Sequence, residues 1–302
     1  MTADTLVLSS GGAHGFAHLG ALSYLDVHGH LGGIRTYVGV SIGAVVAVLL
    51  AAGMSIGAIT RDFFETDPSS LQNPRVFNLI FFGLDDGSRT MRKLQSILAA
   101  LDVPPECTLR QMHERTGKNL AVGAVDVDAR EFVLMDHITH PDVPVLSCLR
   151  ASISVPFAFT PLRIGNRLFV DGALMDAAPM ARVQLRYPGC RMLAVRLTSA
   201  RADPDRSKPV AFGSLAEYSF RVIECLTEAS MRQSPFVDVN DTSRVISVPV
   251  PSSIPWYAPP SDQQKKDMFT LGYEAAEGVF PRVDDRTPPN PVQDEALTIS
   301  PD

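Results

Sequence analysis

Residues 36–51 read TYVGVSIGAVVAVLLA, and this stretch decides the fold. Residues 37–40 are typical of a short buried strand, and the apolar run after Ser41 has the length of a helix. Gly39 and Gly43 stand two positions before and two positions after Ser41. A strand can turn into a helix this sharply only where the flanking residues lack side chains, and the serine hydroxyl is then exposed at the turn.

The same region has no charged residue from position 36 to position 60, so hydropathy alone would suggest a membrane-spanning helix. The run is interrupted by four glycines, Gly39, Gly43, Gly53 and Gly57. These interruptions favour a strand, a turn and a helix over a membrane-spanning helix. Residues 5–9 and 17–27 repeat the pattern of strand followed by helix. The alternation predicts an α/β fold with a mostly parallel sheet and helices on both faces.

Further elements follow along the chain. Two short strands, residues 162–164 and 167–170, flank a two-residue hairpin turn at Gly165-Asn166. Other predicted strands cover residues 120–127, 131–135 and 192–197, and other predicted helices cover 42–52, 56–64, 91–101, 108–115, 145–153, 212–232 and 262–280. We expect one domain from residue 1 to residue 280 and a disordered polar tail from 281 to 302, which is rich in proline and aspartate.

The chain has 302 residues, of which 45% are hydrophobic and 20% charged, and its net charge is −6. This composition is that of a globular protein, and it lacks the basic surface that nucleic-acid binding requires. The four cysteines form no CxxC motif, which favours an intracellular, reduced protein. Because the N-terminus has no basic segment and only a short apolar run, we expect no signal peptide and no transmembrane span. A cytoplasmic or peripheral membrane location follows.

A second motif, Gly11-Gly12-Ala13-His14-Gly15, also lies between a predicted strand and a predicted helix. Glycine-rich turns in this position direct backbone N–H groups outward, where they can bind a phosphate or the oxyanion of an acyl-transfer intermediate. A dinucleotide site would need GxGxxG and an acidic residue about twenty positions later. Ser10 and Arg35 occupy those positions, so nucleotide binding is the weaker alternative.

The third motif is Asp171-Gly172-Ala173, directly after the predicted strand 167–170. Taken alone, an aspartate followed by glycine at the end of a strand is more often a turn residue than a catalytic group.

In this order, the three motifs resemble those of the patatin-like phospholipase family. The resemblance covers residues 5–197, more loosely to 280, and is carried by SGGAHGFAHLG at 10–20, GVSIGA at 39–44, ASISVPFAFTP at 151–161 and GNRLFVDGA at 165–173. It implies a three-layer α/β/α fold, no metal or organic cofactor, and acyl lipids such as phospholipids as substrates. Ser10 departs from the family's usual glycine, and His14 departs from its usual basic residue.

The resemblance also implies a catalytic Ser–Asp dyad. Ser41 would attack the ester carbonyl, and Asp171 would accept the hydroxyl proton. The oxyanion hole would be formed by backbone amides of Gly11, Gly12 and Ala13, and the remaining motif positions are Gly15, Gly39, Gly43, Gly172 and Ala173. The alternative is a catalytically silent protein on the same fold that binds a lipid or a partner.

The order of residues independently favours a dyad over a triad. In α/β-hydrolases the serine is followed by the acid and then by histidine, but the last histidine here is His140, which precedes Asp171. A serine hydroxyl needs a base to act as a nucleophile. We therefore expect Asp171 to lie about 3 Å or less from Ser41, oxygen to oxygen.

The histidines and apolar segments outside the dyad can each have either a structural or a functional role. For His14 we favour an exposed loop imidazole over a group that tunes activity when protonated, and we expect His18 to pack on its helix. For the apolar residues 76–82 we favour core packing over a lid or membrane-contacting loop. Pro255-Trp256-Tyr257 is a second candidate for peripheral membrane contact, because aromatic side chains suit the interfacial zone.

Overall fold

A central eight-stranded sheet forms the middle layer of the molecule in this computed structural model, which describes residues 3–199, 213–233, 243–251 and 253–281. The strand order is β10-β9-β1-β2-β4-β8-β7, with β5 paired to β4. These strands are β1 (Thr5–Leu8), β2 (Thr36–Val40), β4 (Asn119–Asp126), β5 (Glu131–Asp136), β7 (Leu162–Ile164), β8 (Arg167–Asp171), β9 (Met192–Ser199) and β10 (Arg244–Val250). From β10 to β4 all neighbours are parallel, whereas β5, β7 and β8 pair antiparallel.

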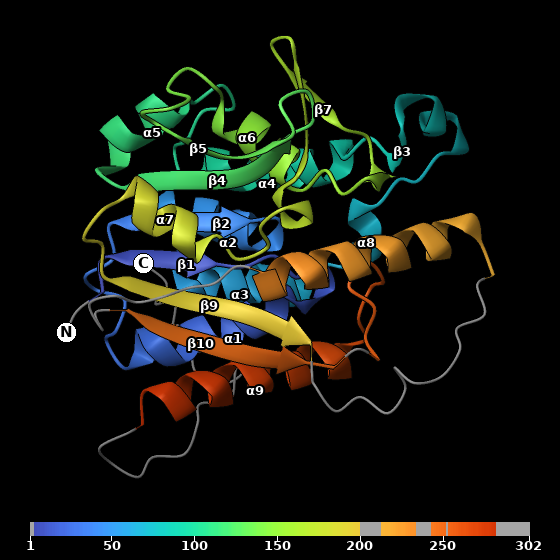
Figure 1. Ribbon diagram of the computed structural model, residues 1–302. Coiled ribbons are helices and arrows are strands. Elements are labelled where there is room, and N and C mark those ends of the chain that lie inside the picture. The colour runs from blue at the N-terminus through green and yellow to red at the C-terminus, as the bar shows by residue number, and fades with distance from the viewer. Residues whose placement is uncertain (1–2, 200–212, 234–242, 252, 282–302) are drawn as a thin grey trace, which may run out of the picture.

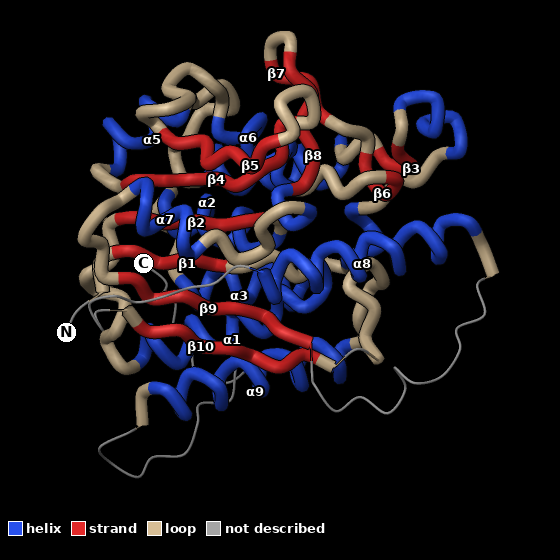
Figure 2. Tube along the Cα trace, in the orientation of Figure 1, coloured by secondary structure: helices blue, strands red, loops and turns tan. Residues whose placement is uncertain are grey.

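Helices cover both faces of this sheet, as Figures 1 and 2 show. The helices are α1 (Gly15–Val27), α2 (Ile42–Ala51), α3 (Ile56–Glu65), α4 (Ser88–Ala100), α5 (Leu109–Thr116), α6 (Val145–Ser152), α7 (Met180–Arg186), α8 (Leu215–Gln233) and α9 (Asp262–Val279). Along β1, Leu6 and Leu8 join the large core formed with α1, α2 and α9, while Val7 joins a smaller core with α7. The alternation of neighbouring side chains between the two cores confirms the predicted α/β/α layering.

Two glycines allow the sharp turn between β2 and α2. A Cβ atom on Gly39 would lie 2.3 Å from Gly43 O, and one on Gly43 would lie 2.5 Å from both Leu8 O and Ser9 O. Backbone atoms cannot yield to such contacts without moving the strand. The prediction of a strand, a tight turn and a helix in this region is therefore confirmed, and the helix α2 is buried at nine of its ten positions.

Strands β2 and β8 pair with the same edge of β4, one after the other along its length. Val40 at the end of β2 pairs with Gly123, and Asp171 at the end of β8 pairs with the next residue, Ala124. Because β5 occupies the other edge of β4 from residue 121 to residue 126, β2 and β8 must share the remaining edge. The residue after Val40 is Ser41, so the register places it and Asp171 at neighbouring positions along one strand.

Several elements differ from the expectations drawn from the sequence. Strand β10 and helix α7 were not predicted, and neither was the small parallel sheet of β3 (Gly83–Asp85) and β6 (Phe157–Phe159). The apolar residues 76–82 form the 3-10 helix η3 (Val76–Phe81) and Phe82, whose apolar side chains are 50–79% exposed. The prediction that they pack in the core is wrong. The predicted tail, 281–302, lies outside the described residues except for Pro281.

No helix in the described part of the chain is both long and apolar enough to cross a membrane.

Substituting Gly43 tests the turn. Gly43→Ala is expected to lower the melting temperature by several degrees or to prevent folding, because its Cβ would meet two carbonyl oxygens of β1. Gly57→Ala is the matched control, because Gly57 lies in α3 with no atom within 4 Å of the added methyl group. Alanine there should stabilise the helix by about 0.5–1 kcal/mol. Thermal unfolding followed by circular dichroism measures the melting temperatures of the two variants. Equal changes in melting temperature would contradict the close packing at Gly43.

Candidate active site

Ser41 occupies the turn between β2 and α2 in a conformation that serine rarely adopts. Its backbone angles are φ 55° and ψ −123°, and its side chain is 8% exposed. Its N–H donates to Ser152 Oγ at 2.9 Å, and Ser152 Oγ donates in turn to Gly123 O at 2.7 Å. A positive φ at a non-glycine residue costs on the order of 1–3 kcal/mol and persists only where the surroundings hold it. The Ser152 link to β4 is such a support.

Asp171 ends β8 and is 1% exposed. Its N–H donates to Ser154 O at 3.0 Å, and its Oδ1 accepts from Ala173 N at 2.8 Å. Oδ2 is buried and accepts no hydrogen bond from any described residue. Burial raises the pKa of Asp171 to about 7, against the opposing effect of the Ala173 N–H and the Ser41 hydroxyl. Near neutral pH this carboxyl is therefore poised between its acid and base forms.

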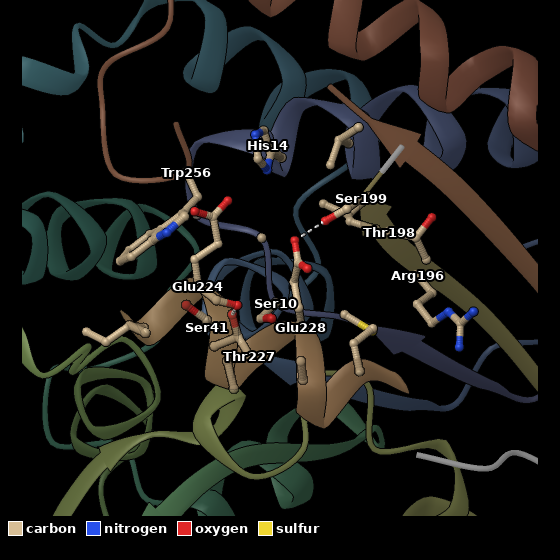
Figure 3. A pocket seen from close by; sticks show the side chains of 18 of the residues that line it. Ser10, His14, Ser41, Arg196, Thr198, Ser199, Glu224, Thr227, Glu228 and Trp256 are labelled. Carbon is tan, nitrogen blue, oxygen red and sulfur yellow. Dashed lines mark hydrogen bonds between the residues drawn. The ribbon is translucent and has the colours of Figure 1, made fainter. Parts of the chain in front are cut away.

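Ser41 and Asp171 line the same cavity, which has a volume of about 960 Å³. Ser10, Gly11, Gly12 and His14 of the glycine-rich turn line it as well, and residues of β9, β10 and α8 form much of the remaining wall (Figure 3). The structure thus brings the three sequence motifs together around one space. The proximity of Ser41 to Asp171 follows from the strand register, while the short hydrogen bond between their side chains stays a prediction.

The glycine-rich turn is engaged by a distant segment of the chain. Gly12 has φ +54°, and a Cβ atom there would lie 2.4 Å from Trp256 O. That same carbonyl accepts a hydrogen bond from Ala13 N at 2.7 Å. Ala13, one of the three residues predicted to form the oxyanion hole, therefore has its N–H directed at a carbonyl oxygen of the protein itself.

The other motif residues keep the turns in close contact. A Cβ atom on Gly15 would lie 2.5 Å from Ile42 Cγ1, and one on Gly172 would lie 2.7 Å from Gly123 O. Gly15 thus lets α1 approach the helix that follows Ser41, and Gly172 lets the turn after Asp171 approach β4. Ala173 supplies the N–H that holds Oδ1 of the aspartate.

The two nearby histidines are held by backbone carbonyls. Nε2 of His14 donates to Ile254 O at 2.7 Å, and burial lowers the pKa of His14. The expectation of an exposed imidazole is wrong, and a lowered pKa leaves His14 uncharged at neutral pH. His18 is fully buried, bonds Ser9 O at 2.8 Å and has a pKa lowered by burial to about 4. It packs within the fold as predicted.

A second cavity, of about 430 Å³, opens on the other side of Ser41 and is largely apolar. Ile42, Val45 and Leu49 of α2 line it at positions i, i+3 and i+7, and residues of α3 and α4 face them. Four residues belong to both cavities: Gly12, Ser41, Val155 and Trp256. Ser41 therefore stands where a polar and an apolar compartment meet.

Sequence reasoning missed the supporting role of Ser152 and the contact of Trp256 with the glycine-rich turn. Ser152 lies within the motif at 151–161, where only the family resemblance drew attention to it. Trp256 was predicted only as an aromatic residue suited to peripheral membrane contact. Across the described residues there is no group of three or more His, Cys, Asp or Glu side chains arranged to hold a metal ion.

The chain is similar in sequence to several known proteins. Residues 6–183 match the family model described as patatin-like phospholipase. The chain is 30% identical over 176 residues to the uncharacterized protein R571 of Acanthamoeba polyphaga mimivirus, a match covering 55% of this chain and 57% of that protein. It is 26% identical over 185 residues to the probable lipid hydrolase 463L of invertebrate iridescent virus 6, covering 58% and 61%. The chain thus matches about three-fifths of the length of these relatives.

Two solved structures share the fold. VipD from Legionella pneumophila superposes with a TM-score of 0.56 at 18% identity, covering 92% of this chain and 67% of that one. The type III effector protein ExoU superposes with a TM-score of 0.51 at 16% identity, covering 92% and 52%.

The raised pKa of Asp171 predicts a stability effect with a definite sign. Protonated Asp171 stabilises the fold at acidic pH, and this stabilisation is lost as pH rises from about 4 through about 7. Asp171→Asn carries no such charge, so it should exceed the wild type in free energy of unfolding by on the order of a few kcal/mol at pH 8 and by roughly half as much or less at pH 5. Urea unfolding at both pH values measures the difference.

Asp126→Asn provides the matched control. Asp126 is also 1% exposed, but there the hydrogen bonds from Ala129 N and Arg167 outweigh burial and lower its pKa. Its replacement should therefore destabilise the protein at pH 8. A gap between Asp171→Asn and the wild type that does not change with pH would contradict the raised pKa.

Proposed function

The chain belongs to the patatin-like phospholipase family, and from this premise we propose that it is a lipid acyl hydrolase of the phospholipase A type, with Ser41 as nucleophile and Asp171 as general base. One observation carries the proposal: a serine in a strained turn shares a cavity with a buried carboxyl whose pKa lies near 7. A general base is most effective when its pKa is close to the working pH.

In the proposed reaction, Asp171 removes the proton of the Ser41 hydroxyl while Oγ attacks the ester carbonyl carbon. Oδ2 is the suited acceptor, since Oδ1 already accepts from Ala173 N and Oδ2 accepts from no described residue. The alcohol leaves with that proton, and Ser41 holds the acyl group as an ester. Water, deprotonated by Asp171, then releases the fatty acid and restores the serine.

The negative charge that develops on the ester oxygen needs N–H donors close to Ser41. Gly11 and Gly12 border the cavity, and the Ala13 N–H lies next to them in the 3-10 turn Gly12–His14 that leads into α1, whose dipole favours negative charge at this end. We assign the oxyanion hole to these three amides. Ala13 can take part once the ester oxygen replaces Trp256 O as its acceptor.

Covalent labelling tests the nucleophile and the base together. A fluorophosphonate probe should modify Ser41 and should not label Ser41→Ala. Asp171→Asn should lower kcat for a short-chain p-nitrophenyl ester by about 10²–10⁴-fold, because it removes the general base. In the wild type, kcat/KM should fall about tenfold per pH unit below about 7, where Asp171 becomes protonated.

The control here is again Asp126→Asn, an equally buried aspartate that does not line the cavity. Its folded fraction should keep near-normal turnover. If the wild type neither reacts with the probe nor cleaves any ester, the catalytically silent lipid-binding alternative replaces this proposal. If Asp171→Asn keeps normal turnover, Asp171 is not the base.

An exposed apolar surface supports peripheral membrane contact. We define the apolar face as the exposed side chains of residues 76–82 together with Phe157, which lies beside them because β6 pairs with β3 at Gly83. Phe82 and Phe157 are 70% and 53% exposed. The adjoining residues Leu84 and Phe159 of the same small sheet line the apolar cavity. The apolar face thus lies on the outer side of a wall of the candidate site, where a lipid surface would be close to Ser41.

Vesicle sedimentation tests this surface. The double substitution Phe77→Ser and Phe82→Ser should weaken binding to phosphatidylcholine vesicles at least about tenfold, since each phenylalanine contributes roughly 1.5–3 kcal/mol when buried in lipid. Turnover of a soluble short-chain ester should not change. Leu185→Ser is the control, because Leu185 is 82% exposed but lies on α7. Equal vesicle binding by all three proteins would rule out the apolar face.

A further inference from the structure

Arg196 lies close to the candidate active site through the register of three parallel strands. Val195 of β9 pairs with Leu8 of β1, and Leu8 pairs with Gly39 of β2. Arg196 is therefore about level with Val40, two strands away. At a strand spacing of about 4.8 Å, its Cα lies roughly 10 Å from the end of β2. Its side chain projects to the same sheet face as that of Ala194 and lines the polar cavity shared with Ser41 (Figure 3).

The guanidinium of Arg196 has no partner among the described residues. Its Nε is buried without a hydrogen bond, and no ion pair or side-chain hydrogen bond joins Arg196 to another residue that the structure describes. An arginine remains charged at all relevant pH values, and a buried donor without an acceptor is costly. Such a group in a cavity wall indicates an anionic ligand that is bound there in use.

Apart from the catalytic candidate Asp171, the other acidic and basic side chains of this cavity are already engaged. Glu228 accepts from Ser199 Oγ at 2.6 Å and pairs with Arg232 at 3.3 Å, and Glu224 pairs with Arg221 at 2.8 Å. These pairs lie on α8 or between α8 and the end of β9, as Figure 3 shows for Ser199 and Glu228. Arg196 thus differs from Arg232, which lines the same cavity but has a carboxylate partner.

The apolar cavity sets the orientation of an ester at Ser41. Its stripe of Ile42, Val45 and Leu49 extends from the nucleophile for on the order of 10 Å along α2. Of its three charged lining residues, Asp62 and Lys93 pair with each other, and Asp85 accepts hydrogen bonds from Asn73 N and Gly87 N. An acyl chain is stable on this side, because its apolar surface leaves water there. The alcohol part of the ester must then point into the polar cavity, toward Arg196.

From this arrangement we propose that Arg196 binds the phosphate of a glycerophospholipid whose acyl chain occupies the apolar cavity. Arg196 would then determine specificity for phospholipids over neutral acylglycerols. The guanidinium suits this ligand, since its planar donors match two phosphate oxygens. The proposal rests on the function proposed above and adds the recognition of the head group to it.

The test compares two substrates that share an acyl chain and differ in the phosphate. Lysophosphatidylcholine and monoacylglycerol are presented in the same detergent micelles, together with a soluble p-nitrophenyl ester. Arg196→Gln should lower kcat/KM for the phospholipid about tenfold or more, as expected for the loss of a charged hydrogen bond, and should change the other two less than twofold. Arg196→Lys should restore part of the loss. Arg232→Gln, the matched control in the same cavity, should leave the ratio between substrates unchanged.

Measuring head-group binding to the variant Ser41→Ala separates the proposal for Arg196 from the proposal for catalysis. Calorimetry should show that glycerophosphocholine binds to Ser41→Ala and that Arg196→Gln in this background weakens the binding. An equal loss on all three esters, or an unchanged preference for the phospholipid, would overturn the assignment. Binding of inorganic phosphate without binding of glycerophosphocholine would overturn it too, because the site would then select a bare anion. Failure of probe labelling alone, with head-group binding intact, would instead contradict the catalytic proposal.

Discussion

The shared edge of β4 is the constraint on which the rest of the site depends. Two strands far apart in sequence meet this edge end to end, one parallel and one antiparallel, so that Ser41 and Asp171 leave the sheet at adjacent positions. Gly123 and Ser152 then hold the turn at Ser41 through a chain of two hydrogen bonds. A shift of one residue in either register would turn the serine or the aspartate to the opposite face of the sheet.

Local patterns predicted most of the fold, because the elements near Ser41 have clear periodicity and glycine punctuation. Strand β10 was missed since it contains Pro249, which is tolerated at the edge of a sheet but weakens the strand pattern in sequence. Helix α7 is only seven residues long. The apolar run 76–82 was assigned to the core because composition alone does not distinguish a buried apolar segment from an exposed one.

The candidate site was predictable only where residues belong to ordered motifs. Ser41, Asp171 and the glycine-rich turn were identified in this way. Ser152 and Trp256 contribute through contacts with distant parts of the chain, such as the bond between Ser41 and Ser152, 111 positions apart, and Arg196 joins them only by its place in the cavity wall. No local pattern marks such residues. His14 likewise bonds the carbonyl of Ile254, 240 positions away, which the sequence gives no reason to place beside it.

The bond between Ala13 N and Trp256 O has an energetic consequence for substrate entry. In the proposed reaction an ester oxygen takes the place of the Trp256 carbonyl, so one acceptor is exchanged for another and the number of hydrogen bonds at the amide is conserved. The cost of entry then falls mainly on the aromatic packing of Trp256 against Phe220 of α8 and against Tyr257. Because Phe220 belongs to α8, whose residues also line the polar cavity, the packing of this cavity wall and the accessibility of the proposed oxyanion donor depend on the same helix.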